Sequence, residues 1–160
     1  MFANISQSCI HYDCPHYFPG DIVTGAIVLH FEKDLRASRL KISWRGDVLA
    51  THIRGDNGEH HKSFSYFSDH TIAWRAENGL NKLPAGYHRF PFSFQLPEKL
   101  LPSYSPKPPA TGYVRYFVGV KIVRPMRINY FVRKNFLVAK QSELPSYSSF
   151  DRMPPPNYEE

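Results

Sequence analysis

Hydrophobic and polar residues alternate with a period of two along much of the chain. The alternation is clearest in RLKISWR at 39–45, RFPFSFQL at 89–96 and GYVRYFVGVKIV at 112–123. Since successive side chains of a β-strand point to opposite faces, the pattern predicts strands with one buried face. The residues predicted to point inward are Leu40, Ile42, Trp44, Phe90, Phe92, Phe94, Leu96, Val114, Tyr116, Val118, Val120 and Ile122.

Five further segments have weaker strand patterns, at 3–11, 22–31, 48–53, 63–75 and 130–139. Clusters rich in Gly, Pro, Asn and Asp lie between the segments, and such clusters are typical of turns. Helical spacing of hydrophobic residues is nowhere sustained. Seven or more short strands joined by such turns predict an all-β fold, an immunoglobulin-like antiparallel β-sandwich.

The composition of the chain changes near residue 140. The last segment, KQSELPSYSSFDRMPPPNYEE, has isolated hydrophobic residues, many serines, three consecutive prolines and no periodicity. Such a segment buries too little apolar surface to offset the entropy lost on ordering it. We therefore expect a folded domain over residues 1–139 and a disordered Pro/Ser-rich tail over residues 140–160.

The 160 residues carry a net charge of +6, which favours anionic partners. Basic residues occupy outward positions of several predicted strands, and an anionic membrane would attract such a surface. Alternatively, these residues only keep exposed strand positions soluble, because the sequence does not say whether the strands are neighbours. No motif indicates nucleic-acid binding. The possible anionic-surface contacts are Arg39, Lys41, Arg45, Arg115 and Lys121.

No residues are arranged as a catalytic or metal site, so we expect no enzyme, no metal and no cofactor. His60 and His61 lie in a polar loop, without the roughly four ordered ligands of a closed metal site. Cys9 and Cys14 are not spaced as a CxxC motif, and we expect reduced thiols. The amino terminus does not resemble a signal peptide, and no apolar run approaches ~20 residues. A cytoplasmic location is expected.

Three long motifs occur in a recognisable order. They are YFPGDIVTGAIVL at 17–29, LPAGYHRFPFSFQLPEKLLPSY at 83–104 and TGYVRYFVGVKIVRP at 111–125. Together they resemble the amino-terminal domain of the arrestin fold, with the closest match in the alpha-arrestin branch. The resemblance covers about residues 5–139, and it implies a β-sandwich of the arrestin N-domain type that acts as an adaptor rather than an enzyme.

Alpha-arrestins link membrane-protein cargo to HECT-type ubiquitin ligases, whose WW domains read PPxY motifs. Residues 155–158 match PPxY, and residues 144–147 match the looser LPxY form. A proline-rich segment is pre-organised as a polyproline II helix, so its docking into an aromatic groove costs little entropy. A third LPxY, at 101–104, lies inside the family motif and is expected to be structural. The expected WW-binding residues are Pro155, Pro156, Tyr158, Leu144, Pro145 and Tyr147.

The resemblance thus implies a cytoplasmic trafficking adaptor recruited to the plasma membrane or endosomes, which promotes ubiquitination, endocytosis or sorting of its cargo. The alternative is a scaffold of the retromer type in endosomal protein transport, which binds through its sheet surfaces. The sequence departs from the family in two respects. Known members carry two arrestin domains, and the paired lysines that sense receptor phosphate in visual and beta-arrestins have no counterpart near residues 9–11.

Overall fold

A computed structural model describes residues 5–53, 59–108 and 111–140 of the chain. These residues form strands joined by turns and loops, without a helix. The strands are Ile5–Tyr12 (β1), Ile22–Phe31 (β2), Leu35–Arg36 (β3), Arg39–Ile53 (β4), Glu59–Arg75 (β5), Lys82–Leu83 (β6), Gly86–Gln95 (β7), Tyr113–Val123 (β8) and Tyr130–Phe136 (β9).

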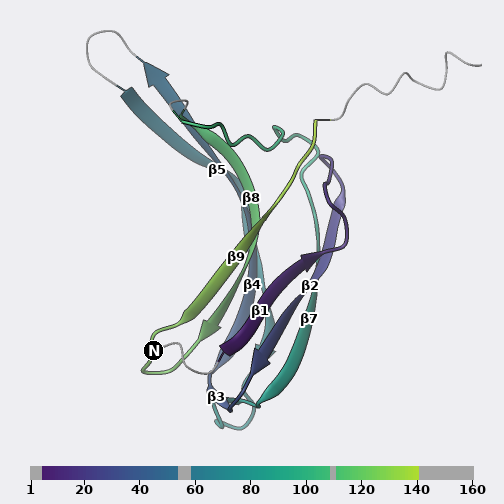
Figure 1. Cartoon of the computed structure of the whole chain (residues 1–160), viewed down its shortest axis with the longest axis vertical. Coiled ribbons are helices and arrows are strands. Elements are labelled where there is room, and N and C mark those ends of the chain that lie inside the picture. Colours follow the sequence, from purple (N-terminus) through teal and green to yellow (C-terminus); the bar gives the residue numbers. More distant parts are fainter. Residues whose placement is uncertain (1–4, 54–58, 109–110, 141–160) are drawn as a thin grey trace, which may run out of the picture.

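Two antiparallel sheets pack face to face as a sandwich (Figure 1). One sheet has the strand order β1-β2-β7, and the other has the order β5-β4-β8-β9. The short strands β3 and β6 pair with each other at one end of the molecule. The predicted all-β antiparallel sandwich is therefore confirmed.

The core lies between the two sheets, where the period-two pattern placed it. Leu40, Ile42, Val118, Val120 and Ile122 are fully buried and belong to one hydrophobic cluster. Trp44 and Phe90 are only partly buried, although both pack against that cluster. The Trp44 ring stacks on the Phe94 ring, with centroids 4.7 Å apart. Alternation alone thus identified the buried side of these strands.

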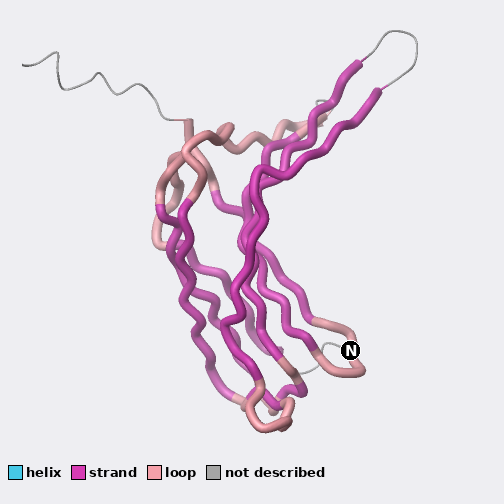
Figure 2. The backbone as a smooth tube through the Cα atoms, turned by 180° about the vertical axis from the view of Figure 1, so that it is seen from behind, coloured by secondary structure: helices cyan, strands magenta, loops and turns pink. Residues whose placement is uncertain are grey.

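The two strands predicted at 39–45 and 48–53 are in fact one continuous strand, β4. Gly46 and Asp47 resemble turn residues in the sequence, but here they form a bulge in the pairing with β5. Gly46 is needed because a Cβ at this position would lie 2.8 Å from the Tyr116 ring and 2.7 Å from the Phe67 ring. With β5, strand β4 makes a long hairpin that projects beyond the other sheet (Figure 2).

The turns contain the residue types that their geometry requires. Gly20 and Gly86 have φ angles of +84° and +113°, in the region where a side chain is strained. Pro91 lies in β7, at the edge of its sheet, where a missing N–H is tolerated. Strands β3 and β6 were not predicted, since two residues are too few to show a period.

At one end of the sandwich, the segment after β9 runs beside Tyr17. The amide of Tyr17 donates to the Leu137 carbonyl, and the amide of Ala139 donates to the Tyr17 carbonyl, both at 2.8 Å. The predicted tail at 140–160 lies outside the described residues, apart from Lys140. All six residues expected to bind WW domains also lie outside the described residues.

Candidate functional site

The five basic residues predicted to point outward lie on one face of the sheet β5-β4-β8-β9. Strands β4 and β8 are neighbours, so Lys41 lies directly opposite Lys121 and Arg45 directly opposite Phe117. Two more arginines lie on the same face. Arg75 of β5 pairs with Arg39 of β4, and Arg133 of β9 pairs with Gly119 of β8. We call this surface the basic face. Its residues are Arg39, Lys41, Arg45, Arg75, Arg115, Lys121 and Arg133.

Like charges face each other across the strands of the basic face. Lys41 and Lys121 form one such pair, and Arg39 and Arg75 form another. Directly opposed like charges destabilise a sheet. Asp47 lies on the same face, opposite Arg115, but one of its oxygens already accepts from Arg45 Nε at 2.6 Å. The surface therefore has an excess of positive charge that an anionic partner would neutralise.

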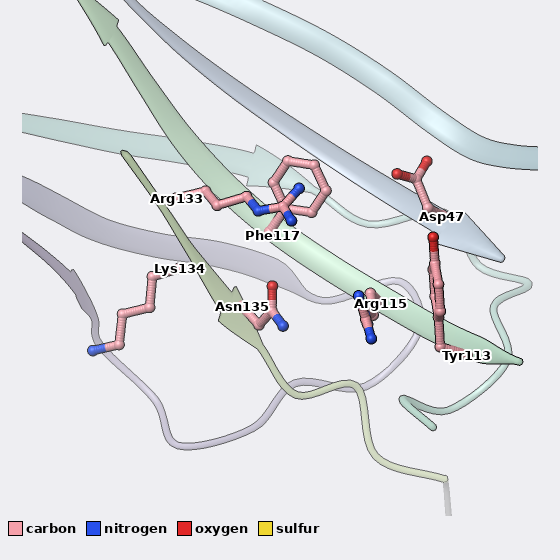
Figure 3. A pocket seen from close by; sticks show the side chains of 7 residues that line it. All are labelled: Asp47, Tyr113, Arg115, Phe117, Arg133, Lys134 and Asn135. Carbon is pink, nitrogen blue, oxygen red and sulfur yellow. The ribbon is translucent and has the colours of Figure 1, made fainter. Parts of the chain in front are cut away.

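An open pocket of about 520 Å³ lies at one end of the basic face (Figure 3). The Arg115 guanidinium lies 3.9 Å from the centroid of the Tyr113 ring, and that of Arg133 lies 4.9 Å from the centroid of Phe117. A guanidinium that lies over an aromatic ring keeps its edge N–H groups available to an anion. The lining residues are Asp47, Tyr113, Arg115, Phe117, Arg133, Lys134 and Asn135.

Phe117 departs from the alternation that predicted the rest of β8. It occupies an outward position, yet it is only 8% exposed. The side chain of Arg133 reaches over its ring from the neighbouring strand. No pattern in the sequence indicates this cover, because β8 and β9 pair only in the folded chain. Phe117 therefore serves as a platform for a basic group on the surface.

Lys134 lines the pocket but belongs to the seam between the two sheets. Its Nζ donates to the Ile10 carbonyl of β1 at 3.1 Å, and Figure 3 shows it pointing away from Arg133 and Asn135. Its own carbonyl accepts from the Tyr12 hydroxyl, which also accepts from the amide of Val118 at 3.2 Å. Burial raises the pKa of the Tyr12 hydroxyl above its usual range. The seam keeps β9 in place and so positions Arg133.

The charge and donor groups of the basic face have the chemistry that attracts anionic groups such as phosphate or carboxylate. In residues 5–53, 59–108 and 111–140, no three His, Cys, Asp or Glu side chains are grouped as a metal site. Over those residues there is also no helix long and apolar enough to cross a bilayer. Arg75 ends a strand predicted from the sequence, but its place on the basic face was not predicted, because only its pairing with Arg39 shows which side it occupies.

Replacing Lys121 by glutamine is expected to stabilise the fold. The substitution removes the repulsion from Lys41, which is worth about 0.2–1 kcal/mol for opposed residues in a sheet. Urea denaturation at low salt measures the change in the free energy of unfolding. Arg45→Gln is the matched control, since Arg45 has Asp47 as its partner and its loss brings no gain. A Lys121→Gln protein less stable than the parent chain would contradict the repulsion.

Comparison with known protein families gives a match over most of the chain. The family model described as arrestin (or S-antigen), N-terminal domain, matches residues 10–144. Among solved structures, Spo0M, a sporulation control protein from Bacillus subtilis, has a similar fold with a TM-score of 0.55. The two chains are 19% identical, and the match covers 87% of this chain and 51% of Spo0M. The chain thus spans about half the length of Spo0M, and at this identity the likeness shows the fold alone.

Proposed function

The chain belongs to the arrestin family, and from this premise we propose that it is a trafficking adaptor of the alpha-arrestin type. An arrestin domain supports an adaptor role in general. The finer proposal is that the chain links membrane-protein cargo to a WW-domain ubiquitin ligase of the HECT type. One observation carries it: a full PPxY motif at 155–158 follows the arrestin domain in sequence, and an LPxY motif at 144–147 begins at the last residue of the match.

Polyproline geometry gives these motifs their mechanism. Pro155 and Pro156 would fill the aromatic groove of a WW domain, and Tyr158 would enter a neighbouring pocket. The second motif, which ends at Tyr147, would increase avidity if the ligase carries several WW domains. In this proposal the protein works in the cytoplasm, is recruited to the plasma membrane or endosomes, and promotes ubiquitination, endocytosis or sorting of its cargo.

The chain contains its own control for the motif. Residues 101–104, Leu-Pro-Ser-Tyr, also match the LPxY pattern, but their backbone is hydrogen-bonded within the fold. Tyr104 exchanges two backbone hydrogen bonds with Val114, at 3.0 and 2.9 Å. The amide of Ser103 donates to the Val138 carbonyl at 2.8 Å. These bonds tie the segment into the fold, as the prediction that it is structural requires.

Tyr158→Ala is expected to weaken binding of a single isolated WW domain by about 30-fold or more. Truncation of an aromatic anchor in a peptide interface typically costs at least about 2 kcal/mol. Calorimetric titration of the full chain with a purified WW domain measures the affinity. The double variant with Tyr147→Ala should show no measurable binding.

Tyr104→Ala is the matched control, and it should bind WW domains as the parent chain does. Parent-like affinity in both the Tyr158→Ala chain and the double variant would refute ligase recruitment through the tail. The remaining candidate would then be a scaffold of the retromer type, which binds partners through sheet surfaces such as the basic face.

A further inference from the structure

The turn between β8 and β9 is a hydrogen-bonded tip at one end of the sandwich. The amide of Arg127 donates to the Arg124 carbonyl at 3.2 Å, which closes a turn with Pro125 and Met126 at its centre. The amide of Arg124 donates to Asn129 Oδ1 at 2.9 Å, and Arg124 Nε donates to the Arg36 carbonyl at 3.3 Å. Side-chain and backbone bonds therefore fix this tip to the rest of the domain.

The tip exposes two large apolar side chains. Met126 is 96% exposed and Ile128 is 81% exposed, so neither packs against the domain. Met126 also has a φ angle of +53°, at the position after Pro125 where such a turn favours Gly or Asn. A bulky residue there is strained and gains no packing within the chain. Leu80 is 73% exposed, in the loop between β5 and β6 that backbone hydrogen bonds tie, through Ala37 and Ser38, to the end of β8.

The segments at this end of the domain are rich in basic residues. Backbone hydrogen bonds tie three segments together at this end, since the Ser38 amide donates to the Val123 carbonyl and the Ala37 amide to the Asn81 carbonyl. The segments 32–39, 75–82 and 121–128 hold eight Lys and Arg against three Asp and Glu. One of the acids, Asp34, is paired with Lys82 at 2.6 Å. Most of the net positive charge of the chain thus lies in the segments at the end that carries the exposed apolar tip.

We propose that this end of the domain docks on an anionic lipid bilayer, with Met126 and Ile128 inserted among the lipids. Exposed apolar side chains at a basic end of the domain match such a surface, since insertion buries the apolar groups and anionic headgroups attract the basic ones. The inference does not depend on ligase recruitment, and it assigns a membrane contact apart from the pocket of the basic face. It also orients the domain. Strand β9 starts at the tip and runs to the opposite end of the sandwich, where Ala139 is bonded to Tyr17, so that end faces away from the membrane (Figure 1).

Vesicle co-sedimentation of the full chain tests the proposal. The chain should bind vesicles of phosphatidylcholine with phosphatidylserine, and bind phosphatidylcholine alone far more weakly. Met126→Ser with Ile128→Ser should lower the partition coefficient about tenfold or more, because two apolar side chains no longer enter the lipid. Arg127→Gln should lower it about fivefold, and added salt should have a similar effect.

Three further variants guard against loss of fold as an explanation. Ile22→Ser removes an exposed isoleucine at the start of β2, away from the tip, and should leave the partition coefficient unchanged. Ile128→Trp should raise partitioning, since tryptophan favours the membrane interface. Met126→Gly should bind vesicles more weakly while its unfolding midpoint stays the same or rises, because glycine relieves the positive φ angle.

Equal partitioning of the Met126→Ser, Ile128→Ser chain and the parent chain would overturn the proposal. Equal binding to vesicles with and without phosphatidylserine would also overturn it. If the double variant only abolishes self-association in sedimentation velocity, the tip is a contact between copies, and the membrane assignment is wrong.

Discussion

Gly25→Ala is expected to unfold the domain under conditions where the parent chain is folded. Gly25 lies in the central strand of its sheet, with Tyr12 of β1 on one side and Phe92 of β7 on the other. A Cβ at this position would lie 2.0 Å from the His11 carbonyl oxygen and 2.6 Å from Cζ of Phe92. Because the first of these atoms is backbone, relief requires β1 to move away from β2.

The cost of this substitution should exceed about 4 kcal/mol, which is a large part of the total stability of a domain. Urea denaturation followed by circular dichroism measures it. Gly79→Ala is the matched control: Gly79 has a φ angle of +71°, but a Cβ there would meet nothing within 4 Å. The control should lose only about 1–2 kcal/mol, from the left-handed backbone alone. A Gly25→Ala protein as stable as this control would contradict the close approach of the His11 carbonyl to Gly25.

The second large effect is expected at Tyr116, the largest fully buried side chain of the described core. Its ring stacks near Phe67, with centroids 6.0 Å apart, and packs against Phe136 at 5.9 Å. Its hydroxyl donates to the Leu101 carbonyl at 2.6 Å, and burial raises the pKa of that hydroxyl above its usual range. The residue therefore joins the core to the loop after β7.

Tyr116→Ala should cost about 3–5 kcal/mol, as other truncations of large aromatic core residues do. Tyr116→Phe keeps the ring and removes only the donor to Leu101, so it should cost about 1–3 kcal/mol. Urea denaturation of both variants separates packing from hydrogen bonding. If the two variants lose the same stability, the ring contacts contribute little and the account of this core is wrong.

The strands could be predicted where one face is buried and the other is polar, as along β8. The prediction failed where local composition and tertiary packing disagree. Gly46 and Asp47 look like turn residues, yet the rings of Tyr116 and Phe67 pack over the glycine and β4 continues through it. Those rings are distant in sequence, so no local pattern indicates their position.

The basic residues of the surface could be named from the sequence, but their grouping could not. Whether Lys41 and Lys121 are neighbours depends on the pairing of β4 with β8, which brings together segments about 80 residues apart. The apolar tip was missed for a related reason. Met126 and Ile128 are ordinary loop residues in the sequence, and only their exposure and the charges around them mark them in the fold.

The central claim is that the domain and the tail have separate tasks, with ligase recruitment assigned to the tail. A chain ending at Ala139 keeps the hydrogen bond from Ala139 to Tyr17, so the described sandwich should fold. The most direct measurement is co-purification of a HECT-type ubiquitin ligase with the intact chain and with the chain lacking residues 140–160. We predict that the intact chain retains the ligase and the shortened chain loses it. Equal retention by both would contradict the account and assign the contact to the sheet surfaces.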